Sequence, residues 1–467
     1  MVKQEVSLIF PPGWDSVTPP LGISSIKSFL QNKDINVITY DFSVKMRGRF
    51  FKGSAKELDK CIRDILNQNP KYIGFTLLYP NFKYSMYMAK KIKQENKDIK
   101  IVVGGPQSSY LKNEIFNHND FIDFCIQGEG EKPFYDLIIN KKSNSRFIKP
   151  VFIENINNLP FPNFDDYDLD SYPVKMLPIS STRGCNRKCT FCGITGNKVS
   201  GPYRKKNPTK VISEINNNIA NYSINNFLFV DADLNSNSKH LNDLCDCIIK
   251  ENIDIQWAAE AQPNISKELI DKMYDSGCRF LWLSPETGSK YIMKKMKKGV
   301  DIDKAKETIN YAGQKGIFIS TWFILGFPGE TEEDIKQTID FAKSIKKNCK
   351  ELLFVPFTLM KGSYIFRNPN DFGIKNINRL PCDIWCTYDM NYPSSELDNV
   401  QLTLSLWEDF NDLNVGYPFL DDYTDEEIEG YIESLDKDKK VIVEEYLKKT
   451  KNREQYSYGT IFKRIFN

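Results

Sequence analysis

The chain has 467 residues, enough for two or three domains, with a hydrophobic content of 41% and a charged content of 27%. Its 63 basic and 61 acidic side chains leave a net charge of +2, which gives no reason to expect a nucleic-acid partner. No apolar run is long enough to cross a bilayer, and the N-terminus lacks a signal-peptide pattern. We therefore expect a globular, cytoplasmic protein without a membrane contact.

Short apolar runs and amphipathic segments alternate along residues 1–140, which we expect to form one domain. Helical spacing of apolar residues is clear at 21–30 and 84–95. Strict alternation of strand and helix predicts a doubly wound parallel sheet, whose ligands bind beyond the carboxyl ends of the strands. The predicted strands are residues 5–10, 36–40, 72–76, 99–103 and 121–126.

Residues 141–173 are rich in proline, asparagine and aspartate, and this composition predicts an irregular linker. Alternation then resumes over 174–370 and predicts about six strand–helix units. Such parallel units carry their chemistry at the carboxyl ends of their strands. The predicted strands are residues 175–180, 226–230, 253–258, 280–284, 316–325 and 351–357.

Several polar side chains follow or end these strands and are candidates for binding a cofactor or a substrate. Each carboxylate could instead be a helix N-cap, because Asp and Glu often precede helices. We favour the N-cap role for Asp233 and Glu330, and ligand contact for Glu286. The candidate ligand contacts are Asp231, Glu260, Glu286 and Ser320.

Three cysteines, Cys185, Cys189 and Cys192, stand in a Cys-x-x-x-Cys-x-x-Cys spacing directly after the first predicted strand of residues 174–370. Thiolates suit soft metals and iron–sulfur clusters, and three of them would leave one iron of a 4Fe–4S cluster open to substrate. A structural zinc site needs four ligands, and the two histidines are far away in sequence. Cys382 and Cys386 form a further pair, too few thiols for a second cluster.

The cysteine motif, with Phe191 before its third cysteine and Gly193 after it, resembles that of the radical S-adenosylmethionine (SAM) superfamily. The glycine-rich loops ahead of it resemble those of the superfamily's cobalamin-binding branch. This resemblance implies a flavodoxin-like first domain, a partial (β/α)6 barrel of the TIM type over residues 174–370, a 4Fe–4S cluster on the cysteines, SAM on the open iron, and cobalamin in the first domain. The implied cobalamin contacts are Pro20, Leu21, Gly22, Thr76, Leu78, Tyr79, Gly104, Gly105, Pro106, Gly128, Glu129, Gly130 and Glu131.

The sequence departs from the family at two points. Gln107 stands where histidine is common, and the Asp-x-His-x-x-Gly motif that supplies a histidine to cobalt is absent. If cobalamin binds, its lower ligand is not a histidine from that motif, and Leu78 or Tyr79 could approach the lower face of cobalt.

The remaining residues, 371–467, predict a helical cap with amphipathic helices at 394–410 and 424–449. The cap could select the substrate or close the open side of the barrel. The basic run 294–299, KKMKKG, reads as a solvated helix end, with a phosphate or an acidic peptide leader as the alternative.

The resemblance implies a cobalamin-dependent radical SAM enzyme, which we expect to methylate an unactivated carbon of a small-molecule or peptide substrate, such as a natural product or a lipid. An electron donor such as flavodoxin or ferredoxin is implied as a partner. Two alternatives remain open: a ring contraction, cyclisation or other rearrangement begun by the same radical, and an iron–sulfur redox protein without enzymatic activity.

Overall fold

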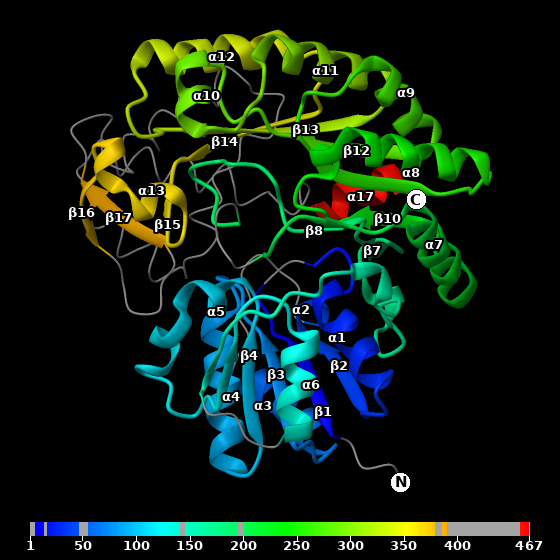
Figure 1. Cartoon of the computed structure of the whole chain (residues 1–467), viewed down its shortest axis with the longest axis vertical. Helices are drawn as coiled ribbons and strands as arrows, with labels where there is room; N and C mark the ends of the chain where they lie inside the picture. Colours follow the sequence, from blue (N-terminus) through cyan, green and yellow to red (C-terminus); the bar gives the residue numbers. More distant parts are fainter. Residues whose placement is uncertain are drawn as a thin grey trace. The chain divides into compact units, whose positions relative to one another are not determined.

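The computed structural model describes residues 5–13, 16–45, 55–140, 145–194, 200–378, 385–389 and 458–466. The chain folds into two compact units (Figure 1). No helix among the described residues is long and apolar enough to cross a membrane. Unit 1 comprises 1–178, 197–206 and 380–384, and unit 2 comprises 179–196, 207–379 and 385–467.

Unit 1 is built on a six-stranded parallel sheet in the order β2-β1-β3-β4-β5-β6. This confirms the doubly wound sheet and its five predicted strands, while β6 lies inside the predicted linker. The strands are β1 (Val6–Phe10), β2 (Val37–Asp41), β3 (Tyr72–Thr76), β4 (Lys100–Gly104), β5 (Phe124–Ile126) and β6 (Phe147–Ile148).

Helices cover this sheet, with α1 packed against α6 and α3 against α4. Alternate apolar residues of β1 meet the buried faces of α1 and α6 in one core cluster. The helices are α1 (Leu21–Gln31), α2 (Phe42–Lys45), α3 (Ala55–Leu66), α4 (Phe82–Glu95), α5 (Pro106–Leu111) and α6 (Glu131–Asn140), and the 3-10 helices are η1 (Lys112–Phe116), η2 (Ile156–Asn158) and η3 (Leu169–Ser171). A short strand, β9 (Arg204–Lys205), also belongs to unit 1.

The segment around Asp166 fastens the predicted linker to unit 1. Asp166 Oδ2 lies 2.7 Å from the ammonium group of Lys27, whose side chain is only 1% exposed. The same oxygen accepts hydrogen bonds from the amide and the hydroxyl of Thr39, and Tyr172 donates to Asp41 at 2.6 Å. Because these bonds hold α1 and β2, this part of the segment is an integral piece of unit 1 rather than a loose connection.

Unit 2 contains a second six-stranded sheet in the order β14-β13-β12-β11-β10-β7, in agreement with the predicted strands. Its strands are β7 (Leu177–Ile179), which begins in unit 1, β10 (Asn226–Phe229), β11 (Gln256–Ala261), β12 (Cys278–Leu283), β13 (Phe318–Leu325) and β14 (Glu351–Pro356), with a short strand β8 (Thr182–Arg183). Its helices are α7 (Pro208–Tyr222), α8 (Ser238–Lys250), α9 (Lys267–Asp275), α10 (Lys290–Met296), α11 (Ile302–Lys315) and α12 (Glu332–Ile345), with a 3-10 turn η4 (Leu234–Asn237).

The last described helix, α17 (Tyr458–Phe466), packs on the face of this sheet opposite to the outer helices (Figure 1). The ring of Phe462 lies 5.1 Å from that of Phe280 and 5.6 Å from that of Trp282, measured between centroids. Asn226 at the start of β10 donates to the carbonyl of Phe466 at 3.1 Å. Helix α17 therefore contacts β10 and β12 on the inner face of this sheet.

Strands β15 (Leu359–Met360), β17 (Trp385–Asp389) and β16 (Lys375–Asn378) form a small antiparallel sheet, in that order. A short helix, α13 (Tyr364–Arg367), and the 3-10 helix η5 (Pro369–Phe372) precede β16. The sequence predicted helices but no strands after residue 370, so β16 and β17 were not expected. The predicted helices at 394–410 and 424–449, and Cys382, lie outside the described residues.

The turn between β13 and α12 is closed by Glu330, which is fully buried. Its Oε2 accepts the amides of Gly326 at 2.5 Å and of Phe327 at 3.2 Å. The N-cap of α12 is Thr331, which forms a capping box with Asp334, so the N-cap role predicted for Glu330 is wrong. Burial raises the pKa of Glu330 to about 8, since an apolar environment disfavours the carboxylate.

We predict that Asp166→Ala destabilises unit 1 by about 3 kcal/mol, because it leaves the ammonium of Lys27 buried without a carboxylate. Urea unfolding followed by circular dichroism measures the loss. The control is Asp170→Ala, whose partner Lys175 is largely exposed, and it should lose less than about 1 kcal/mol. Equal losses in the free energy of unfolding would show that the buried ion pair stabilises the protein no more than the exposed one.

The raised pKa of Glu330 predicts a pH effect of known sign. Between its ordinary pKa of 4.5 and the folded value of about 8, the unfolded chain ionises while the folded chain stays protonated, so this group's stabilising contribution falls as pH rises. Glu330→Gln keeps an acceptor and cannot ionise. Its melting temperature relative to wild type should therefore increase from about pH 5 to about pH 9, whereas the exposed control Glu332→Gln should show no such trend.

Candidate cluster and cofactor site

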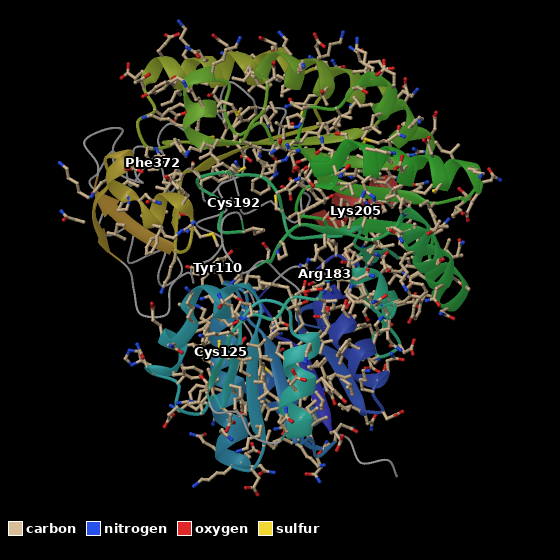
Figure 2. The ribbon with its side chains drawn as sticks, in the orientation of Figure 1. Tyr110, Cys125, Arg183, Cys192, Lys205 and Phe372 are labelled. Carbon is tan, nitrogen blue, oxygen red and sulfur yellow. The ribbon has the colours of Figure 1, made fainter. Side chains whose placement is uncertain are left out.

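The three cysteines of the motif lie in a loop without regular secondary structure that follows β8; Cys192 is labelled in Figure 2. Cys189 is buried, Cys185 and Cys192 are partly exposed, and none of the three is in a disulfide. Burial raises the pKa of Cys189 to about 12, and the charges of Cys192 and Cys185 add to this shift.

The donor set fits an iron–sulfur cluster better than a single metal ion. No three His, Cys, Asp or Glu side chains of the described residues converge closely enough to hold one ion. A cubane cluster binds each thiolate through a different iron, so the three sulfurs need not share one centre. The loop therefore supplies three of the four thiolates that would saturate such a cluster.

Asp231, at the end of β10, holds the entrance of the cysteine loop. Its carboxylate accepts the amide of Ser181 at 3.0 Å, the hydroxyl of Ser181 at 2.9 Å and the hydroxyl of Thr182 at 2.5 Å. Burial raises the pKa of Asp231, although these hydrogen bonds oppose the shift. Asp231 was a predicted cofactor contact; the structure gives it this positioning role, and direct contact with SAM stays a prediction.

Asp233 holds the middle of the same loop. Its Oδ2 lies 2.6 Å from Nε of Arg187, which stands between the first two cysteines, and its Oδ1 accepts the amide of Gln262 at 3.3 Å. Asp233 stands at the N-cap position of η4, as predicted, but its side chain makes no capping hydrogen bond and holds Arg187 and the amide of Gln262 instead. The sequence analysis missed Arg187, although its position inside the motif could have indicated a link to an acidic strand end.

Backbone hydrogen bonds fix the far end of the loop. The amide of Thr190 donates to the carbonyl of Met296 at 2.8 Å, and the carbonyl of Thr190 accepts the amide of Ile365 at 3.1 Å. The ring of Phe191 packs against the core cluster that contains Ile292 and Met296. The loop is thus attached to α10 and α13 as well as to β10, and Gly193 is buried beside it.

A buried cation lies near the cluster loop. The ammonium of Lys298 is 2.5 Å from Oε1 of Glu286, and both side chains are nearly inaccessible to solvent. Burial opposes the charge of Lys298, but Glu286, Cys189 and Glu260 together raise its pKa above the usual value. In turn, Lys298 lowers the pKa of Cys189 and so favours the thiolate form that binds iron.

The interpretation of the basic run as a solvated helix end is confirmed for the exposed Lys294 and Lys297, but it is wrong for the last lysine, Lys298, which is buried. The backbone of Glu286 is also fixed, with its carbonyl accepting the amide of Ile324 at 2.8 Å and its φ at 71°. The protein atoms around Glu260 raise its pKa to about 7 by displacing water, although part of this side chain remains exposed. Ser320 donates to Glu351 at 2.5 Å inside the sheet, and its role as a ligand contact stays a prediction.

In unit 1, the predicted cobalamin contacts lie at the carboxyl edge of the sheet. Gly105 has φ of 94° and an added Cβ would lie 2.9 Å from the carbonyl oxygen of Leu77, so only glycine fits this turn. A Cβ at Gly22 would meet no atom within 4 Å, and one at Gly104 only an oxygen at 3.9 Å. Because no protein atom requires glycine at Gly22 or Gly104, these positions have open space for a flat cofactor.

Further residues of the predicted set, and two of their neighbours, lie at the same edge of the sheet. Asn81 is fully buried and accepts the amide of Leu78 at 2.8 Å, which fixes the loop after β3. Gln107 is buried on α5. The remaining predicted contacts lie at the same edge: Thr76 ends β3, Tyr79 is in the loop between β3 and α4, Pro20 and Leu21 stand at the start of α1, and Pro106 begins α5.

The last predicted cobalamin loop, Gly128–Glu131, is partly occupied by protein contacts. Glu129 accepts the guanidinium of Arg204 at 2.8 Å and the amide of Ile153 at 2.8 Å. A Cβ at Gly130 would lie 2.6 Å from Ile26, so this glycine permits close packing on α1, and Glu131 is buried at the start of α6. A direct contact between Glu129 and a cofactor stays a prediction, because its carboxylate already anchors β9.

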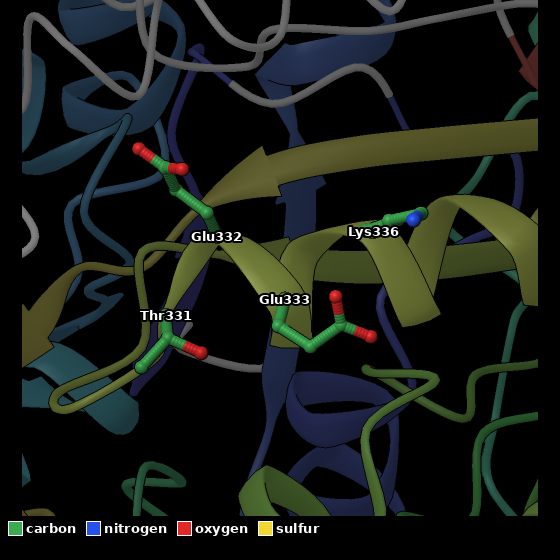
Figure 3. Close-up of a pocket in the computed structure, with 4 residues that line it drawn as sticks. All are labelled: Thr331, Glu332, Glu333 and Lys336. Carbon is green, nitrogen blue, oxygen red and sulfur yellow. The ribbon is translucent and has the colours of Figure 1, made fainter.

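The pocket shown in Figure 3 lies at the first turn of α12 and is not part of this site. Thr331, Glu332, Glu333 and Lys336 line it. The carboxylates of Glu332 and Glu333 point in different directions, and neither is one of the predicted contacts.

Comparisons with known proteins match both halves of this arrangement. Residues 15–138 match the B12 binding domain, and residues 179–342 match the Radical SAM superfamily. An uncharacterized methyltransferase of Pyrococcus horikoshii is 25% identical over 74% of this chain and 79% of its own length. The anaerobic magnesium-protoporphyrin IX monomethyl ester cyclase of Rubrivivax gelatinosus is 21% identical over 61% of this chain and 56% of its own length.

Two solved structures share the fold. The radical SAM methyltransferase TsrM from Kitasatospora setae aligns with a TM-score of 0.66 at 15% identity, over 80% of this chain and 78% of its own. The cobalamin-dependent radical enzyme OxsB aligns with a TM-score of 0.69 at 14% identity, over 96% of this chain and 75% of its own. With the cysteine loop and the open carboxyl edge of unit 1, the two domain matches identify the protein: it belongs to the radical SAM enzymes that carry a B12-binding domain, and its cofactors are a 4Fe–4S cluster, SAM and cobalamin.

Proposed function

We propose that this enzyme is a cobalamin-dependent methyltransferase that acts on an unactivated carbon of a small-molecule, lipid or peptide substrate. The observation that carries the proposal is a three-cysteine loop, fixed by buried carboxylates, in the same chain as a B12-binding domain. When bound, the cluster with SAM supplies a carbon-centred radical, and cobalamin supplies the methyl group. The Pyrococcus relative carries the name methyltransferase, which supports this choice.

The residues around the loop have separable tasks in this proposal. Asp231 and Asp233 fix the loop, so that the thiolates are oriented before a cofactor arrives. Lys298 counters the negative charge of the thiolates and can pair with the carboxylate of SAM, while Glu286 holds that ammonium in place. Glu260, whose side chain is partly exposed, lies within reach of the same charges and is the candidate for contact with SAM or substrate.

A second candidate is a cyclisation or another rearrangement that uses the same cofactors without methyl transfer. The cyclase of Rubrivivax gelatinosus supports it, since that relative is 21% identical over 61% of this chain. Both functions need an external electron, for which we propose a flavodoxin or ferredoxin. Both also suit a reducing compartment such as the cytoplasm, where iron–sulfur ligands stay reduced.

The proposed reaction can be tested on enzyme reconstituted anaerobically with iron, sulfide and cobalamin. Incubation with SAM and candidate substrates should give a product heavier by one methyl group together with S-adenosylhomocysteine. Cys192→Ala should lose the cluster absorbance and this product but retain cobalamin. Cys247→Ala changes a partly exposed cysteine outside the motif and is the matched control. It should keep the cluster absorbance, the methylated product and bound cobalamin. Deoxyadenosine without methyl gain would select the rearrangement, and failure to bind cobalamin would reject both functions.

The role of Lys298 predicts a defect in SAM binding. Lys298→Met removes a charged hydrogen-bond donor, a loss of about 2 kcal/mol, and should weaken SAM binding at least about tenfold. Equilibrium dialysis with holoenzyme measures it. Lys294→Met, on the exposed side of α10, is the control and should bind SAM as wild type does. Unchanged affinity in Lys298→Met, with an intact melting temperature, would assign the lysine to thiolate stabilisation alone.

A further inference from the structure

Three lysines form a patch at α10, next to the cluster loop. Between residues 287 and 300 the chain has five lysines and no aspartate or glutamate. Two of the five are paired with carboxylates, one inside unit 2 and one on its surface. Within the described ranges, no ion pair engages the other three. We call them the lysine patch: Lys294, Lys295 and Lys297.

The patch has features of a recognition surface rather than of a merely solvated helix end. Lys294 and Lys297 are exposed, and Tyr291 between them and the start of the helix is 54% exposed, which is high for a large aromatic side chain. The ammonium of Lys295 lies 4.8 Å from the ring centre of Tyr291, and that of Lys297 lies 4.8 Å from the ring centre of Tyr364. Exposed tyrosines such as Tyr291 are enriched at protein interfaces, and both tyrosine rings are within reach of a cation–π contact with a lysine of the patch.

The opposite face of the same helix holds the cluster loop. Met296 accepts the amide of Thr190, which lies between the second and third cysteines, and Phe191 packs with Ile292 and Met296. One helix diameter, about 10 Å, therefore separates the exposed lysines from the loop that carries the thiolates. A protein seated on the patch would bring its own redox group close to that loop.

We propose that the lysine patch is the docking site of an acidic, one-electron carrier protein of the flavodoxin type. This rests on the proposed function, which requires one external electron for each SAM cleaved. The anionic flavin hydroquinone of the carrier gives up one electron and becomes the neutral semiquinone, and the electron passes to the cluster site on the three cysteines. Electrostatic docking of this kind is transient, fast and sensitive to salt.

The test measures binding directly, by calorimetric titration of holoenzyme with a flavodoxin at low ionic strength. Lys294→Gln/Lys297→Gln should bind about tenfold more weakly than wild type, and its affinity should depend less on salt. Lys56→Gln/Lys60→Gln on α3 removes the same charge from exposed positions of unit 1 and should bind as wild type does. Both pairs of substitutions are at exposed positions, and melting temperatures confirm that each variant folds.

A second readout separates this proposal from the proposed function. Reduction of the enzyme by reduced flavodoxin, followed by its visible absorbance, should slow about tenfold in the patch variant, whereas reduction by dithionite should be unchanged. If dithionite supports no SAM cleavage in wild type, the proposed function fails while the binding data still stand. Equal flavodoxin affinity in the patch and control variants overturns the docking site, and so does a patch that binds transfer RNA instead of flavodoxin.

Discussion

The site depends on two buried carboxylates that hold a loop with no regular structure of its own. Asp231 accepts three hydrogen bonds at the entrance of the cysteine loop, and Asp233 pairs with Arg187 in its middle. Burying a carboxylate is unfavourable unless hydrogen-bond donors surround it. The cysteine loop supplies these donors, and the carboxylates in turn fix the position of the loop. Three thiolates can then be presented in one orientation although the backbone between them forms neither helix nor strand.

Charge balance is the second constraint on this site. Thiolates in a buried loop repel one another, and burial disfavours their ionised form, as the raised pKa of Cys189 indicates. Lys298 supplies the opposing charge just after the end of α10. Burial alone would lower the pKa of this lysine, and the carboxylate of Glu286 keeps it protonated. Further lysines on the outer side of α10 and just after it are exposed to solvent. One short helix therefore lies between the cysteine loop and a basic surface.

In unit 1, tertiary contacts turn a segment of irregular composition into part of the domain. Asp166 binds the buried Lys27 and both polar groups of Thr39, and β6 extends the sheet within the same stretch. The glycine-rich loop after β5 behaves similarly, since Glu129 anchors Arg204. Loops that the sequence marks as ligand-binding thus divide into positions left open, such as Gly22 and Gly104, and positions that support the fold.

The sequence by itself determined the two parallel sheets, the approximate positions of their main strands and the cysteine motif, because periodicity and close spacing are local properties of a chain. Only the tertiary structure decided which polar side chains bind other parts of the protein and which remain candidates for contact with a cofactor. Lys298 follows the end of α10, where helical periodicity no longer indicates which side is buried, and its partner is twelve residues earlier. Likewise, nothing local distinguishes Asp233 or Glu330 from a helix cap, since their donors come from another loop or from a turn that only folding closes.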